Sequence, residues 1–180
     1  MMNVSTPIVL PFFLTAVADV NGDGVLDVFG YIPEQRRRHV PAPSRVLLHR
    51  GINVAAADFT ADGIVDVVVT NYFGMYFLRG RGDGAFDPPV AFVLQGNQPD
   101  QQQVITSADF NRDGKPDLLT CGAFCSIRLG DGDGNFQTPQ RLDFGQAGYR
   151  YLVADFDNDG LPDIAVMDSG KVELLLNRNR

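Results

Sequence analysis

Short apolar runs alternate with aspartate- and glycine-rich segments along most of the chain. Three aliphatic runs each follow an aspartate-rich segment, at residues 67–69, 118–119 and 164–166. A second apolar run comes soon after each of them, at residues 76–78, 127–129 and 172–174. Short runs of this kind, bounded by Gly, Asp and Pro, are typical of β-strands joined by turns. The pattern therefore predicts an all-β chain.

The aspartate-rich segments are four copies of one nine-residue pattern. They span residues 19–27, 58–66, 109–117 and 155–163, each directly after an alanine, and their starts lie 39, 51 and 46 residues apart. Glycine-rich segments (80–86, 130–136) and Pro-led runs (88–92, 138–144) follow in the second and third copies. With the run that leads into each copy, the pattern predicts four strands per repeat, which is typical of β-propeller blades. We predict a single domain, residues 1–180, built as a β-propeller of four blades.

The two ends of the chain carry parts of the same repeat. Residues 6–12 match residues 138–144, and the C-terminus follows the third strand of the fourth repeat. Pairing the N-terminal strand, residues 8–12, with the C-terminal blade would close a ring and remove its exposed edges. We expect a closed four-bladed monomer, with a dimer of eight blades as the alternative if four blades cannot close.

Acidic side chains are concentrated in the four aspartate-rich segments. The formal net charge is −7, and thirteen of the 22 acidic residues lie in these segments. Clustered carboxylates repel one another unless a cation binds them. The charge pattern therefore indicates cation sites rather than a generally acidic surface.

Each aspartate-rich segment carries the oxygen donors of a calcium loop. Ca²⁺ takes about six to eight oxygens, which side chains at loop positions 1, 3, 5 and 9 and the carbonyl of position 7 can supply, while Gly at position 6 allows a sharp turn. We expect up to four calcium ions, and the weakest site in the second loop because Thr60 offers a neutral hydroxyl. The predicted ligands are Asp19, Asn21, Asp23, Val25 and Asp27; Asp58, Thr60, Asp62, Ile64 and Asp66; Asp109, Asn111, Asp113, Lys115 and Asp117; and Asp155, Asp157, Asp159, Leu161 and Asp163.

Two other interpretations of these loops are less favourable. Asp, Asn and Gly also form hairpin turns that hold no metal, but four copies with Asp at positions 1, 5 and 9 favour calcium. An EF-hand is excluded because its twelfth position requires Glu. In this chain that position holds Gly30, Val69, Thr120 and Val166.

The four loops resemble those of FG-GAP or VCBS repeat proteins, the group that includes integrin α-chain propellers and several secreted lectins. Residues 80–86 and 130–136 resemble that family's Gly-x-Gly-Asp-Gly-x-Phe element, and the resemblance spans nearly the whole chain. The chain lacks a Gly-Ala-Pro tripeptide, so it is more similar to the bacterial VCBS-like branch than to integrins. Members of the family most often close with seven blades. The resemblance implies an extracellular or cell-surface protein that recognises a protein or glycan.

Known catalytic motifs are missing from the sequence. It contains no Gly-x-Ser-x-Gly elbow, nucleotide-binding loop or His-rich zinc motif, and its paired carboxylates lie in the aspartate loops. We therefore predict a non-catalytic calcium-binding module for recognition or adhesion, with no catalytic residue and no organic cofactor. One alternative is an accessory propeller of a secreted hydrolase or lyase. The other is a lectin that stacks sugar rings on Tyr31, Tyr72, Tyr76, Tyr149 and Tyr151.

Nucleic-acid binding and membrane insertion are not expected. The basic cluster at residues 36–38 lies in a Pro-bounded insert, residues 33–43, without interleaved aromatic residues. No apolar span has the length that crosses a bilayer. Residues 7–18 resemble a signal peptide, but they have no basic segment and align with strands elsewhere in the chain, so we expect them to be part of the fold.

Two further motifs have competing interpretations. Cys121 and Cys125 flank three residues and would form either a cross-hairpin disulfide or two buried thiols, of which we favour the thiols. Arg81-Gly82-Asp83 spells an integrin-recognition tripeptide. Its Gly and Asp belong to the repeat, and Asp131 replaces the arginine in the next copy, so we expect a structural role.

Overall fold

The computed structural model shows an all-β chain and describes residues 13–19, 21–24, 27–31, 53–71, 74–92, 104–122, 124–142, 150–168 and 170–178. No helix among these residues has the length and apolar character needed to cross a membrane. The described strands are β1 (Phe13–Ala18), β2 (Asp27–Tyr31), β3 (Asn53–Ala57), β4 (Asp66–Asn71), β5 (Gly74–Leu78), β6 (Val90–Phe92), β7 (Val104–Ala108), β8 (Asp117–Cys121), β9 (Cys125–Arg128), β10 (Gln140–Leu142), β11 (Arg150–Ala154), β12 (Asp163–Asp168) and β13 (Lys171–Leu175).

The strands form four antiparallel sheets that follow the sequence repeats. The sheets are β1-β2, β3-β4-β5-β6, β7-β8-β9-β10 and β11-β12-β13, and neighbours in each sheet are consecutive in the chain. The predicted four strands per repeat are thus confirmed in the second and third sheets. The Pro-led runs of the sequence supply the outermost strands, β6 and β10.

Each aspartate loop connects the first two strands of its sheet. The alanine before the loop pairs with the ninth loop residue in every repeat, so all four loops begin and end at the same point of the ladder. These pairs are Ala18↔Asp27, Ala57↔Asp66, Ala108↔Asp117 and Ala154↔Asp163. The register therefore gives the four loops equivalent positions in their sheets.

The hydrophobic core lies between successive sheets rather than within one of them. Val68 and Met75 of the second sheet pack with Leu118 of the third, and Leu119 of the third packs with Ile164 of the fourth. Alternate residues of a strand point to opposite faces, so adjacent leucines on β8 serve two different cores. Burial of each such aliphatic side chain contributes ~1.5–3 kcal/mol.

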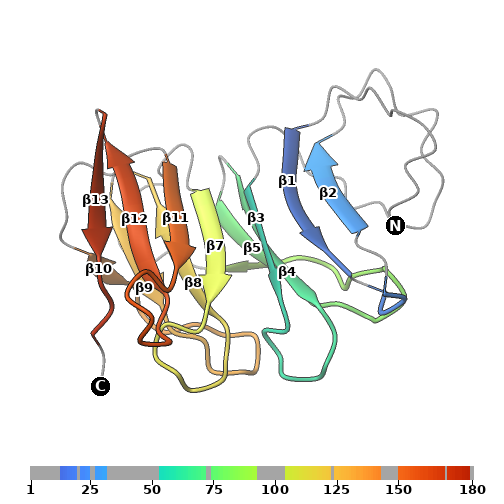
Figure 1. Cartoon of the computed structure of the whole chain (residues 1–180). Coiled ribbons are helices and arrows are strands. Elements are labelled where there is room, and N and C mark those ends of the chain that lie inside the picture. The colour runs from blue at the N-terminus through green and yellow to red at the C-terminus, as the bar shows by residue number, and fades with distance from the viewer. Residues whose placement is uncertain are drawn as a thin grey trace.

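The described sheets stand in an open row. The first strands β1, β3 and β7 contact one another in this order. The sheets β1-β2 and β11-β12-β13 stand at opposite ends of the row (Figure 1). The predicted closed ring is not observed among the described strands. The N-terminal strand predicted at residues 8–12 lies outside the described residues, as does the basic insert at residues 33–43.

A disulfide joins the two cysteines across the hairpin of β8 and β9. Cys121 and Cys125 are directly opposite each other in the ladder, with their Cα atoms 4.0 Å apart. Both side chains are buried in the core between the third and fourth sheets. The expectation of two free thiols is therefore wrong, because the hairpin register brings the two sulfur atoms together.

Candidate metal centres

The first aspartate of each loop organises the loop backbone. In the fourth loop the Asp155 carboxylate accepts hydrogen bonds from the backbone N–H groups of Asp159, at 3.1 Å, and Gly160, at 2.8 Å. Asp19, Asp58 and Asp109 accept the equivalent bonds in the other loops. Because one carboxylate holds the turn that carries positions 5 and 6, the loop is shaped before any ligand binds.

Two positions in every loop have left-handed backbone. The glycine at position 6 has φ between 80° and 82° in all four loops, as the predicted turn requires. Position 4 is also left-handed, which the sequence analysis missed. The residues there are Gly22 (φ 71°), Ala61 (54°), Arg112 (61°) and Asn158 (59°). Gly and Asn are favoured in this region, so the residue type indicates a left-handed position 4 in only two of the four loops.

The ninth-position aspartates lie inside the sheets. Asp66, Asp117 and Asp163 are fully buried. One oxygen of Asp117 accepts the N–H of Phe110 at 2.8 Å, and the other accepts the N–H of Gly130 at 2.9 Å. Asp66 and Asp163 are bound in the same way, by the second loop residue and by the second residue after the third strand. These carboxylates therefore tie each loop to its own sheet.

Burial changes the pKa of two of these carboxyl groups. Burial raises the pKa of the Asp66 and Asp117 carboxyl groups, and the backbone hydrogen bonds that they accept oppose that rise. A buried carboxylate is favourable when it is well hydrogen-bonded or beside a cation. The backbone donors supply the first of these conditions.

The fourth loop gathers three exposed carboxylates. Asp155, Asp157 and Asp159 each offer an oxygen, and these oxygens lie within 4.8 Å of one another. An Arg178 guanidinium nitrogen lies 4.0 Å from Asp157. Three exposed oxygens at this separation can turn to one cation. Leu161, whose carbonyl oxygen is a predicted calcium ligand, donates its N–H to the Asp159 carboxylate at 2.8 Å.

The first and third loops place an amide where the fourth has a carboxylate. Asn111 donates from its amide nitrogen to Asp113 at 3.0 Å and accepts that residue's N–H through its oxygen, also at 3.0 Å. Asn21 and Asp23 repeat this arrangement. The Lys115 ammonium donates to the Asp131 carbonyl. Val25 lies outside the described residues, and the structure describes only the backbone of Asp27.

The second loop already holds a cation from its own chain. A guanidinium nitrogen of Arg79 lies 2.9 Å from Asp62, and this hydrogen bond holds the pKa of Asp62 below its usual value. The Thr60 hydroxyl donates to Asp66 at 3.1 Å. Ile64 donates its N–H to Asp62 at 2.9 Å. The second loop thus has fewer carboxylates than the fourth and a closer positive charge.

The glycine-rich segments connect neighbouring sheets. The N–H of Gly134, in the third sheet's segment, donates to the Phe59 carbonyl of the second aspartate loop at 2.9 Å. The Phe136 ring packs edge-on against Phe59 with centroids 5.4 Å apart. In the earlier segment Arg81 pairs with Asp87 at 2.7 Å, and Asp83 accepts the N–H of Ala85. These local contacts agree with a structural role for the Arg-Gly-Asp tripeptide.

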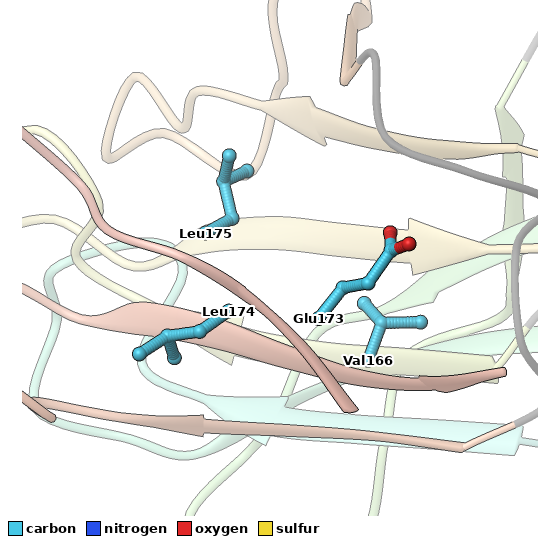
Figure 2. Close-up of a pocket in the computed structure, with 4 residues that line it drawn as sticks. All are labelled: Val166, Glu173, Leu174 and Leu175. Atoms are coloured by element: carbon cyan, nitrogen blue, oxygen red, sulfur yellow. The ribbon is translucent and has the colours of Figure 1, made fainter. Parts of the chain in front are cut away.

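The described residues also form a pocket of ≈ 340 Å³ on the last sheet, lined by Val166, Glu173, Leu174 and Leu175. Figure 2 shows Glu173 and Leu175 on one side of β13 and Leu174 on the other. Val166 and Leu175 also contact the core between the third and fourth sheets. The pocket therefore lies beside that interface and combines an apolar wall with one carboxylate.

Of the tyrosines predicted to stack on sugars, the two whose side chains are described do not lie together. Tyr76 and Tyr151 pack against two different cores, and burial raises the pKa of Tyr151. Among the described residues its hydroxyl has no hydrogen-bond partner. Tyr72 and Tyr149 lie outside the described residues, and only the backbone of Tyr31 is described.

Comparisons with known proteins agree with this repeat architecture. A solved structure, reported as the structural basis of specific recognition of non-reducing terminal N-acetylglucosamine by an Agrocybe aegerita lectin, matches with a TM-score of 0.60 and 26% identity. The match covers 89% of this chain and 51% of that chain, so this chain spans about half the length of the lectin. No curated protein sequence matches significantly. The model of the FG-GAP-like repeat matches residues 50–120. Residues 50–120 are therefore similar to the FG-GAP-like repeats, the family that the loop sequences resemble.

Proposed function

We propose that this chain is a non-catalytic, calcium-binding set of β-propeller blades that acts as an extracellular recognition or adhesion module. The observation that carries the proposal is the group of three exposed carboxylates at Asp155, Asp157 and Asp159. Among the described residues, an Arg178 nitrogen lies 4.0 Å from Asp157, and the Arg112 guanidinium donates to the backbone carbonyl of Asp159 rather than to its carboxylate. The same loop backbone recurs in the other repeats, which supports one site per loop.

The donor set fits calcium better than a transition metal. Every predicted ligand offers oxygen, and hard oxygen donors suit Ca²⁺, whereas Zn²⁺ and Cu²⁺ favour nitrogen and sulfur. Positions 1, 3 and 5 would bind through side chains, and position 7 through its carbonyl. The buried ninth-position carboxylate would stand behind the ion and hold the loop on its sheet. Bound calcium would thereby stiffen the face of the module that carries the loops.

The four sites should differ in affinity. The fourth loop offers four carboxylates, Asp155, Asp157, Asp159 and Asp163, and should bind most tightly. The second loop should bind most weakly because Thr60 is neutral and Arg79 already neutralises Asp62. The first and third loops, with an amide at position 3, should lie between these limits.

Calcium is expected to raise the melting temperature of the chain, and EDTA to lower it. A ligand at about one hundred times its Kd stabilises the native state by ~2.7 kcal/mol per site. In a chain of this length that corresponds to roughly 5–10 °C per site. Differential scanning calorimetry with calcium or EDTA measures the shift, and titration calorimetry counts the sites.

Two matched variants test whether calcium binds at the aspartate loops rather than at acidic residues elsewhere in the chain. Asp157→Ala should remove the tightest site from the titration, whereas Glu173→Gln, outside the loops, should leave the number of sites unchanged. Identical melting curves in calcium and EDTA would refute the calcium proposal. A titration in which Glu173→Gln loses a site would refute the assignment to the loops.

A lectin is the second candidate function. The lectin neighbour and the pocket beside the third and fourth sheets support it. Glu173 would accept hydrogen bonds from sugar hydroxyls above the apolar wall of Leu175. Titration with glycans that end in N-acetylglucosamine should give saturable binding that weakens at least about tenfold in Glu173→Ala, as expected when a hydrogen bond to a charged group is lost. Failure of a glycan array to capture the chain would exclude this candidate and leave protein recognition or an accessory role beside a hydrolase or lyase.

The extracellular location is supported by one observation, a disulfide, and by the proposed calcium sites. A disulfide joins Cys121 and Cys125, and disulfides persist mainly in oxidising compartments such as the cell exterior. Calcium loops with several exposed carboxylates also suit the high calcium concentrations found outside cells. The chain would therefore work at a surface or in a secreted form.

A further inference from the structure

The last sheet exposes one apolar face. Leu152 on β11, Met167 on β12, and Val172 and Leu174 on β13 are each at least half exposed. Leu152 and Leu174 both pair with Ala165, and Met167 pairs with Val172. Residues that pair directly across a ladder lie on the same face of a sheet. These side chains therefore form one continuous surface, called here the open face.

The open face is equivalent, by register, to faces that are covered in the two preceding sheets. Val172 stands opposite Met167 in the ladder, as Cys125 stands opposite Cys121 and Met75 opposite Thr70. Met75 is 2% exposed and Cys125 1% exposed, because each packs against the next sheet in the row, whereas Val172 is 66% exposed. The open face therefore has the position of an inter-sheet contact.

The second loop residue shows the same contrast. Phe59 and Phe110 are each 2% exposed in their loops, while the equivalent Phe156 is 40% exposed. The Phe59 carbonyl accepts a hydrogen bond from the next sheet's Gly134, and the Phe110 carbonyl accepts one from Asn177. A sheet packed on the open face would bury Phe156 in the same way. It could also donate a hydrogen bond to the Phe156 carbonyl, as the next sheet does at the two earlier positions.

We propose that a second copy of this chain covers the open face with its first sheet, β1-β2. Within one copy these two sheets stand at opposite ends of the row (Figure 1). In a two-fold pair, each last sheet would pack on the partner's first sheet, which closes the assembly with two identical contacts. Two copies would together span about the length of the lectin neighbour, of which this chain matches about half.

Light scattering after size-exclusion chromatography, in calcium-containing buffer, tests the proposal on the 180-residue chain. The expected mass is twice that of the 19.7 kDa chain. Val172→Glu and Leu174→Glu should each weaken association about tenfold or more, since burial of a charge replaces burial of an apolar side chain. Both positions are exposed in the single chain, so these variants should fold normally by circular dichroism.

Glu173→Gln is the matched control, because Glu173 lies between these residues and points to the other side of β13 (Figure 2). It should leave the mass unchanged. A wild-type chain that is monomeric at all concentrations would overturn the proposal, and slow amide exchange along β13 in that monomer would assign the cover to the same chain. A dimer unaffected by Val172→Glu and Leu174→Glu would overturn it as well.

Discussion

Asp117→Ala is expected to lower the free energy of unfolding by about 3–5 kcal/mol, even when calcium is removed with EDTA. The substitution leaves the N–H groups of Phe110 and Gly130 buried without an acceptor. Each unsatisfied buried donor costs ~1–3 kcal/mol, and hydrogen bonds to charged groups lie at the upper end. The lost side chain also leaves a cavity at a fully buried position. Urea unfolding in EDTA measures the change.

EDTA is essential to this experiment because the aspartate pattern of the sequence predicts the same residue as a calcium ligand. If Asp117 acted through calcium alone, its removal would cost nothing once the metal is gone. Asp133→Ala is the matched control, since Asp133 is an exposed aspartate of the neighbouring glycine-rich segment, and it should change stability by less than about 0.5 kcal/mol. A difference below about 1 kcal/mol between Asp117→Ala and wild type in EDTA would contradict the structural role.

The ninth-position aspartate is both a predicted calcium ligand and a buried acceptor of backbone hydrogen bonds, and only the first role could be predicted from the sequence. In a linear motif, Asp117 is one more oxygen donor at the end of a calcium loop. Its burial depends on Gly130, thirteen residues away along the chain, which the β8-β9 hairpin brings behind the loop. Nothing in the spacing of the aspartates encodes that contact. The loops themselves were predictable, because one pattern recurs four times in phase with the strands.

Strand order was also predictable, whereas the arrangement of the sheets was not. Apolar runs, alanines and Pro-led segments marked each strand of the second and third sheets, and consecutive strands pair as in most antiparallel meanders. Whether such sheets close into a ring depends on the angle between them, which side-chain packing sets. Val172 and Phe156 are exposed, whereas the equivalent Met75 and Phe59 are buried. This difference marks the end of the row of sheets, which the repeat pattern of the sequence does not indicate.

The disulfide illustrates the same limit at a smaller scale. The sequence placed Cys121 and Cys125 on either side of a short turn, and both outcomes were open. The strand register favours the disulfide, because it places the two residues directly opposite each other in the ladder. A hairpin shifted by one residue would have turned the two side chains to opposite faces of the sheet.

Gly130→Ala is expected to destabilise the chain by about 3 kcal/mol or more. An added Cβ would collide with the Pro116 carbonyl oxygen, a backbone atom that cannot rotate away. Overpacking of this kind usually costs ~1–3 kcal/mol, and relief by movement would also break the bond from Gly130 to the buried Asp117. Gly80 meets the Val65 carbonyl in the same way in the second sheet. Urea unfolding measures the loss, and calcium titration should show a weakened third site.

Gly170→Ala is the matched control for the general cost of replacing glycine. Gly170 has φ 80° and an added Cβ would meet nothing within 4 Å, so the cost should be the ~1–2 kcal/mol of a left-handed alanine. At position 130 glycine is required because there is no room for a Cβ atom. The backbone angle does not require it, since Gly130 is not among the residues with positive φ. If Gly130→Ala were no less stable than Gly170→Ala, the close approach of the third strand to its aspartate loop would not hold, and the backbone donor to Asp117 would have to come from elsewhere.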